Sequence, residues 1–140
     1  MRLNPPVLLH VEDDEVTAYL FQKAVEAVAP QTQLIRVPDG DECLAFLHRE
    51  GSYNNAPAPD AIVLDLNLPK RNGLEVLAAV SLMYDLHCLP VVIFSGSLNV
   101  RREADFLALG VRKLFAKDRG WQSFRNVAEF VCGMLQNSRT

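Results

Sequence analysis

Five short apolar runs recur along the chain without polar alternation. Residues branched at Cβ are common in the first four, which is typical of strands. A strand with one face in water alternates apolar with polar residues, so these unbroken runs predict strands that are buried on both faces. The predicted strands cover Val7–Val11, Leu34–Val37, Ala61–Leu66, Val91–Phe94 and Leu114–Ala116.

The segments between these strands have apolar residues at helical spacing. Because neighbouring parallel strands need crossover connections, strands that alternate with helices predict a parallel sheet covered on both faces. The fold class is therefore a doubly wound, five-stranded α/β sheet. The apolar positions that define the predicted helices lie within Val16–Ala27, Cys43–Leu47, Leu74–Leu82, Phe106–Leu109 and Trp121–Leu135.

Length and composition favour one folded domain. The chain has 140 residues, of which 49% are hydrophobic and 22% are charged. That length suits a single well-buried core, and the composition is too apolar for disorder. We expect one domain over residues 1–140 with a core from about residue 6 to residue 136, and we interpret Gly51–Pro59 as a loop within it.

The charge pattern argues against two classes of partner. A formal net charge of -3, mixed in sign along the chain, predicts neither nucleic-acid nor membrane-surface binding. No apolar run approaches the roughly 20 residues of a membrane span, and the N-terminus does not have the pattern of a signal peptide. The cysteines, Cys43, Cys88 and Cys132, are odd in number and form no CxxC motif, so we expect a reducing, cytoplasmic location.

Polar side chains end or follow four of the predicted strands. Glu12 and Asp13 follow the first strand, Asp65 lies at the end of the third, Ser95 follows the fourth and Lys117 follows the fifth. In doubly wound sheets the binding crevice lies beyond the carboxyl ends of the strands. We therefore expect these five side chains to meet at one edge of the sheet.

This set of side chains indicates phosphoryl transfer. Three carboxylates at one edge repel one another, and a hard divalent cation neutralises them. Mg²⁺ suits few carboxylates because it keeps several waters and binds phosphate oxygens. A lysine and a hydroxyl supply the cation and the hydrogen-bond donor that a phosphoryl group needs. The pattern predicts a Mg²⁺ site in which one of the acids is the nucleophile.

Each of these residues also has an ordinary structural interpretation. An acid after a strand is commonly a helix N-cap, so Asp13 or Asp14 could cap the first helix. Lys117 alone would be a surface charge and Ser95 alone a turn residue. Their joint presence at strand ends favours the functional interpretation. His10, inside the first strand, is expected to be a core histidine with its hydrogen bonds satisfied.

Several motifs carry a resemblance to a known family. They are VEDD at residues 11–14, PDGDECL at 38–44, LDLNLPKRNGLEVL at 64–77, FSGS at 94–97 and the segment 110–117. The spacings of 30 residues from Asp65 to Ser95 and 22 from Ser95 to Lys117 match the same family. In these features the chain resembles the CheY-like receiver domains of two-component response regulators. The resemblance implies a flavodoxin-like (βα)5 fold with strand order 2-1-3-4-5.

The resemblance also implies roles for single residues. Asp65 would be the phosphoacceptor, Asp13 a direct Mg²⁺ ligand and Glu12 an acid that acts mostly through metal-bound water. The backbone carbonyl of Asn67 would be a further metal ligand. Asp65 itself would complete the metal site.

The implied function is that of a response regulator phosphorylated by a sensor histidine kinase. Ser95 and Lys117 would hold the phosphoryl oxygens, and output would pass through protein contacts. The protein would catalyse only its own phosphorylation and dephosphorylation. The loop GSYNNAPAPD at residues 51–60, the LNLPKRNG stretch and the lack of proline after Lys117 resemble most the small single-domain regulators paired with phytochrome-type kinases.

The chain departs from the family pattern at two positions. Asp118 stands where most receivers have a proline in a cis peptide, so we expect a trans peptide after Lys117. Leu114 stands where the family has an aromatic residue that responds to phosphorylation. Phe115 cannot substitute for that residue, because neighbours along a strand point to opposite faces.

Three other functions were weighed. A haloacid dehalogenase-type phosphohydrolase would need Asp-x-Asp at the first strand, and the sequence after Asp65 lacks the second acid. A flavodoxin-like nucleotide binder would need a loop that cradles phosphate after the first strand, where this chain has three acids. The remaining alternative is a receiver-fold interaction module that works independently of phosphorylation. In either receiver interpretation, the apolar side chains of the fourth helix, fifth strand and fifth helix predict a homodimer surface.

Overall fold

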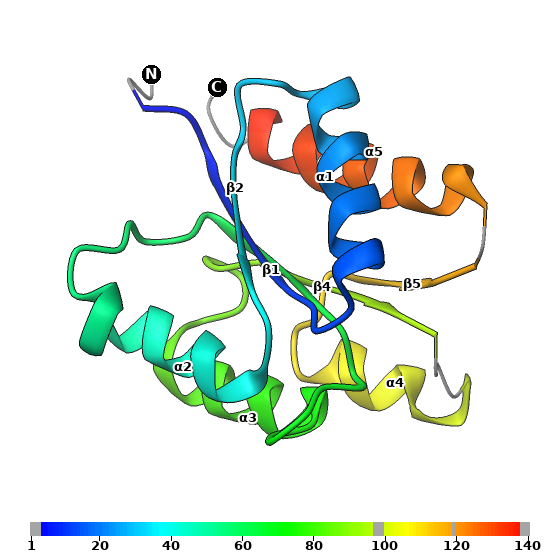
Figure 1. The fold of residues 1–140 in the computed structure, drawn as a ribbon. Helices are drawn as coiled ribbons and strands as arrows, with labels where there is room; N and C mark the ends of the chain where they lie inside the picture. The colour runs from blue at the N-terminus through cyan, green and yellow to red at the C-terminus, as the bar shows by residue number, and fades with distance from the viewer. Residues whose placement is uncertain (1–3, 97–99, 119, 138–140) are drawn as a thin grey trace.

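The computed structural model describes residues 4–96, 100–118 and 120–137. A parallel sheet of five strands lies at its centre, in the order β2-β1-β3-β4-β5 (Figure 1). This order confirms both the predicted fold class and the predicted topology. The strands are β1 (Val7–Val11), β2 (Gln33–Val37), β3 (Ala61–Leu64), β4 (Val91–Ser95) and β5 (Lys113–Ala116).

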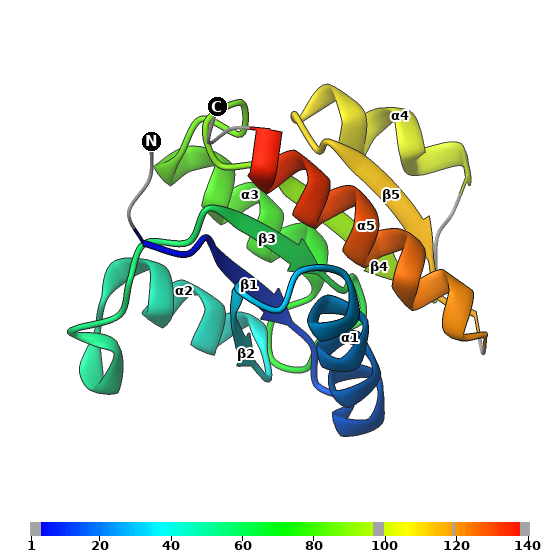
Figure 2. The ribbon, with the colours of Figure 1, turned by 90° about the horizontal axis from the view of Figure 1, so that it is seen from above.

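Helices cover both faces of the sheet. α1 (Glu15–Val28) and α5 (Trp121–Asn137) lie on one face, and α2 (Gly40–His48), α3 (Gly73–Met83) and α4 (Val100–Ala108) lie on the other (Figures 1 and 2). A short 3-10 helix at Gly51–Tyr53 lies in the predicted loop. Among the described residues, no helix is both long enough and apolar enough to cross a membrane.

The first strand is buried on both of its faces. Leu9 and Val11 belong to the core cluster beneath α2 and α3, whereas Leu8 belongs to the cluster beneath α1 and α5. His10 is on the same side as Leu8, with its ring centroid 4.5 Å from that of Phe21 in α1. Both faces of β1 are therefore buried, as the unbroken apolar run predicts.

Backbone hydrogen bonds extend the sheet beyond the ends of its strands. The Asp65 amide donates to the Val11 carbonyl at 3.2 Å, and the Lys117 amide donates to the Ser95 carbonyl at 3.0 Å. The Glu12 amide donates in the same way to the carbonyl of Val37 at 3.0 Å. These bonds hold the residues after the strands in register, so their side chains come together at one edge.

Gly73, the first residue of α3, allows the helix to approach the chain just after β3. A Cβ atom added there would lie 2.5 Å from both the Asp65 carbonyl oxygen and the Leu66 Cα. Neither backbone atom can move aside without shifting the loop that carries Asp65. This glycine therefore serves close packing against the site.

Replacement of Gly73 by alanine should lower the free energy of unfolding by about 1–3 kcal/mol, the usual cost of overpacking. The matched control is Gly133→Ala in α5, where an added Cβ meets nothing within 4 Å. That variant should gain about 0.5–1 kcal/mol, because alanine is the better helix former. Urea denaturation of both variants measures the difference, and equal effects would contradict the close approach.

Candidate functional site

Three carboxylates gather at the carboxyl edge of the sheet. Glu12 and Asp13 follow β1, and Asp65 follows β3, its neighbour in the sheet. A ligand oxygen of each lies within 4.8 Å of those of the other two. Glu12 and Asp65 are 1% and 4% exposed, whereas Asp13 is open to solvent. The predicted acidic cluster is thus present, with a solvent-accessible side.

The turn after β1 gives its two aspartates different positions. Asp14 is the N-cap of α1, and its carboxylate accepts hydrogen bonds from the Thr17 amide at 2.9 Å and the Thr17 hydroxyl at 2.6 Å. These bonds to Thr17 lower the pKa of Asp14 below its ordinary value. Asp14 therefore caps the helix, while Asp13 belongs to the acidic cluster.

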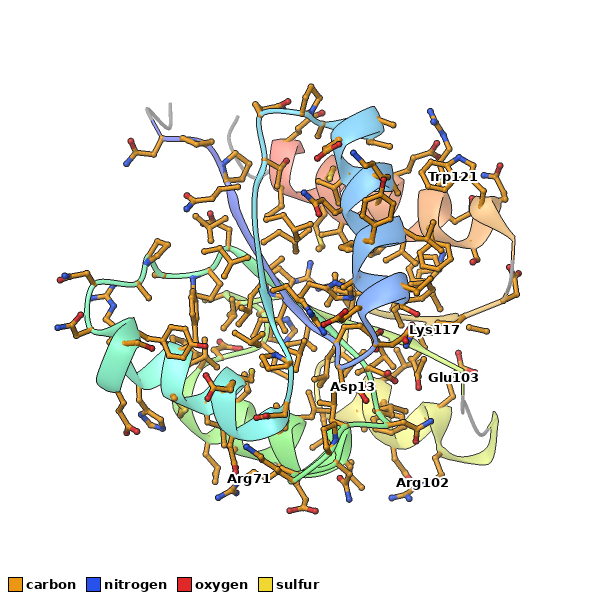
Figure 3. All side chains as sticks on the ribbon, viewed as in Figure 1. Asp13, Arg71, Arg102, Glu103, Lys117 and Trp121 are labelled. Atoms are coloured by element: carbon orange, nitrogen blue, oxygen red, sulfur yellow. The ribbon has the colours of Figure 1, made fainter. Side chains whose placement is uncertain are left out.

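Lys117 reaches two of the acids from the end of β5. Its ammonium nitrogen lies 2.8 Å from Oδ2 of Asp65 and 2.6 Å from Oε1 of Glu12. Figure 3 shows Lys117 and Asp13 near the same end of the sheet. Burial disfavours the charge of Lys117, but its bonds to Asp65 and Glu12 outweigh burial and raise its pKa above the ordinary value.

The other oxygen of Asp65 is also bound. The Ser95 hydroxyl, fully buried at the end of β4, donates to Oδ1 of Asp65 at 2.8 Å. The Asn67 amide donates to the same oxygen at 3.1 Å. Both carboxylate oxygens of Asp65 therefore face hydrogen-bond donors from three different segments. Asn67 meets Asp65 through its backbone N–H, and the metal-ligand role of its carbonyl stays a prediction.

The environment of Glu12 fits a nearby hydrated cation. Its Oε2 accepts a hydrogen bond from the Asp14 amide at 3.2 Å, and its buried Oε1 lies 2.6 Å from the ammonium nitrogen of Lys117. Burial raises the pKa of Glu12 to about 7, although Lys117 opposes that rise. Three carboxylates around one ammonium leave excess negative charge, which a hard divalent cation with oxygen ligands balances.

Two features near the site differ from the sequence analysis or were missed by it. His10 is buried as predicted, but its Nδ1 has no hydrogen-bond partner, so the prediction of satisfied hydrogen bonds was wrong. Burial lowers the pKa of His10 to about 3, which keeps the ring neutral.

Arg36 in β2 was missed by the sequence analysis. Its guanidinium donates to the backbone carbonyls of Glu12 and Asp13 at 2.8 and 3.0 Å.

The predicted departures at the end of β5 are confirmed. None of the described peptide bonds is cis, including the one between Lys117 and Asp118. Leu114 packs against the core cluster beneath α2 and α3, and Phe115 packs on the opposite face. The ring centroid of Phe115 lies 5.6 Å from that of Phe130 in α5. The end of the FSGS motif, at residue 97, lies outside the described residues.

Comparison with known proteins decides the family. Residues 8–128 match the model of the response regulator receiver domain. The chain belongs to this family. It is also 43% identical over 97 residues to the response regulator Rcp1 of Synechocystis, an alignment that covers 69% of this chain and 66% of Rcp1. It is 33% identical over 97 residues to the probable methanogenesis regulatory protein FilR2 of Methanothrix harundinacea, covering 69% of this chain and 61% of that protein. The chain thus spans somewhat less than two thirds of these relatives.

Solved structures agree with the family assignment. The phosphorylated cyanobacterial phytochrome response regulator RcpA superposes with a TM-score of 0.81 at 33% identity, covering 91% of both chains. The Mn²⁺-bound form of Rcp1 also gives a TM-score of 0.81, at 35% identity and with 91% of both chains covered. The receiver fold and the predicted family are therefore confirmed, and the acidic cluster occupies an arrangement suited to a divalent metal.

The different positions of Asp13 and Asp14 predict different effects of their removal. Asp13→Ala should weaken Mg²⁺ binding by more than about tenfold, since even outer partners of metal ligands have effects on that scale. Asp14→Ala should leave Mg²⁺ affinity nearly unchanged but cost about 1 kcal/mol of stability through the lost N-cap. Calorimetric titration and urea denaturation separate the two effects. Equal losses of affinity would show that both acids face the metal.

Proposed function

We propose that the chain is a Mg²⁺-dependent phosphoacceptor that takes a phosphoryl group from a sensor histidine kinase onto Asp65. The observation that carries this proposal is the environment of Asp65. Lys117 and Ser95 contact its two oxygens, and the carboxylates of Glu12 and Asp13 lie within 4.8 Å. A carboxylate that has hydrogen-bond donors at both oxygens and two further acids beside it suits a nucleophile that accepts a phosphoryl group next to a cation.

The proposed site residues have different roles in metal binding and phosphoryl transfer. Asp13, Asp65 and the backbone carbonyl of Asn67 would hold Mg²⁺ directly, and Glu12 would act through metal-bound water. When bound, the metal would supply charge that offsets the phosphoryl oxygens. An oxygen of Asp65 forms the new bond to phosphorus as the bond from the kinase histidine to phosphorus breaks.

Lys117 and Ser95 would then change partners. In the structure they bind the oxygens of Asp65, at 2.8 Å in both cases. Once one of those oxygens carries the phosphoryl group, the new negative charge lies on the phosphoryl oxygens. The ammonium and the hydroxyl follow that charge. The segment after Ser95 would move with the hydroxyl, and its residues 97–99 lie outside the described part of the chain.

A phytochrome-type histidine kinase is the partner that we propose. The support is the 33% identity to RcpA, a cyanobacterial phytochrome response regulator whose structure was solved in the phosphorylated form. We place the protein in the cytoplasm as one receiver unit, without nucleic-acid or membrane contacts and without catalysis beyond its own phosphorylation and dephosphorylation. The net charge of -3 is consistent with this set of partners.

A second candidate function is a receiver-fold module that works through standing contacts. The observation that favours it is the arrangement of β5. Leu114 supplies no ring behind Ser95, and Phe115 is packed against Phe130 on the opposite face. A ligand shifts two states only through its different interactions with them, so a missing ring implies a smaller shift across this face.

The surface concerned is the face formed by α4, β5 and α5. Leu107, Leu109 and Trp121 there are 47%, 43% and 43% exposed. Large apolar side chains exposed on neighbouring elements are typical of interaction surfaces. We therefore propose a homodimer through this face, present whether or not Asp65 is phosphorylated.

Phosphorylation is tested with acetyl phosphate and Mg²⁺. The chain should gain the mass of one phosphoryl group, and Asp65→Asn should abolish the gain because Asp65 has both Lys117 and Ser95 at its oxygens. Asp60→Asn is the control, since that carboxylate accepts a hydrogen bond from the Val7 amide at the other end of the sheet. Continued labelling of Asp65→Asn would overturn the assignment.

The standing dimer is tested by sedimentation with and without beryllofluoride, a phosphoryl mimic. The dimer fraction should be the same in both conditions and should fall when Leu107 and Trp121 are replaced by serine. Leu82→Ser is the control, since Leu82 is 89% exposed on α3, outside this face. A monomer that dimerises only with beryllofluoride would refute the standing surface and restore a phosphorylation-driven switch.

A further inference from the structure

Arg36 connects the second strand to the turn that carries the acids. It is paired with His10 across β1 and β2, one residue before the last residue of each strand. From there its Nε donates to the Glu12 carbonyl at 2.8 Å, and one terminal nitrogen donates to the Asp13 carbonyl at 3.0 Å. One planar guanidinium thus binds two consecutive carbonyls, which fixes the orientation of both peptide units.

These peptide units determine where the acidic side chains point. The turn runs from Glu12, whose amide donates to the Val37 carbonyl, to Asp14, the N-cap of α1. Within this turn, Arg36 holds the Glu12 and Asp13 carbonyls. A rotation of either peptide would swing the Asp13 carboxylate away from Asp65. We propose that Arg36 is a positioning residue for the divalent-metal site.

The charge of Arg36 disfavours Mg²⁺ binding, whereas its hydrogen bonds to the turn favour it. A guanidinium near a cation site repels the incoming cation, so a purely electrostatic Arg36 would weaken metal binding. The residue is exposed and lines, with His10, Glu15 and Tyr19, a hollow of about 250 Å³ between α1 and β2. Solvent therefore screens the repulsion, while hydrogen bonds from a charged donor hold the turn. We expect positioning to outweigh repulsion. Replacement of Arg36 would weaken Mg²⁺ binding if positioning dominates and strengthen it if repulsion dominates.

This inference rests on the proposed Mg²⁺ site, and Arg36→Gln and Arg36→Lys test it together. Gln removes the charge and the fork of donors, whereas Lys keeps the charge but cannot bind two carbonyls with a rigid plane. Positioning predicts that Arg36→Gln binds Mg²⁺ about tenfold more weakly than wild type, as for other outer partners of metal ligands. Arg36→Lys should lie between the two. Calorimetric titration at fixed ionic strength measures the affinities.

The control is Arg112→Gln. Arg112 also donates from its guanidinium to a backbone carbonyl, that of His87 at 3.2 Å, but it lies just before β5 and outside the acidic cluster. It should bind Mg²⁺ with wild-type affinity. Thermal unfolding in chelator separates positioning from general stability, because a merely structural role would lower the unfolding temperature without changing the affinity of the folded protein.

The outcomes are distinct. Tighter binding by Arg36→Gln with unchanged binding by Arg36→Lys would show that charge alone acts, and would overturn the inference. Wild-type affinity in both variants would overturn it as well. If the wild-type protein itself binds no Mg²⁺, the proposed metal site fails and this inference fails with it. Should Arg36→Gln not fold, the loss expected for Arg36→Lys still decides between geometry and charge.

Discussion

The burial of charge at the carboxyl edge of the sheet is the constraint on which the rest of the site depends. Glu12 and Asp65 are 1% and 4% exposed, and a buried carboxylate is costly unless it is paired. Lys117 pairs with both, and Ser95 completes the hydrogen bonds of Asp65. These partners come from the ends of different strands, so the acids can be buried only when the sheet is assembled.

The same constraint explains the division between the sheet interior and its edge. Buried residues, nearly all of them apolar, fill both faces of β1, β3 and β4, and the polar groups of the site begin where each of these strands ends or just after it. Ladder hydrogen bonds continue one step into the loops, from Asp65 to Val11 and from Lys117 to Ser95. The backbone of the site therefore continues the hydrogen bonding of the sheet, while the side chains meet beyond it.

Much of this arrangement could be predicted from the sequence because it depends on local patterns. Apolar runs located all five strands, and the residues after them supplied the acids, the hydroxyl and the lysine. Arg36 could not be found in this way, since its role depends on which strand lies beside β1 and on how far its side chain reaches. Strand order came from the family resemblance and not from periodicity.

The geometry at Asp65 limits what phosphorylation can change. Its oxygens are bound by Ser95, Asn67 and Lys117, so a phosphoryl group on Asp65 would meet donors that are already in place. In the proposed function, the free energy that favours the phosphorylated state would be the difference between two similar sets of hydrogen bonds, and the movement of Ser95 would link that difference to the rest of the chain. On β5, Leu114 has no aromatic ring that could respond to a movement of Ser95. Phe115 is packed on the other face of the sheet against Phe130. In the proposed function, a phosphoryl group on Asp65 would therefore act on the face of α4, β5 and α5 through Ser95 and not through a ring on β5. In the proposed function, this separation would let Asp65 gain and lose a phosphoryl group while the proposed contact surface on that face stays intact.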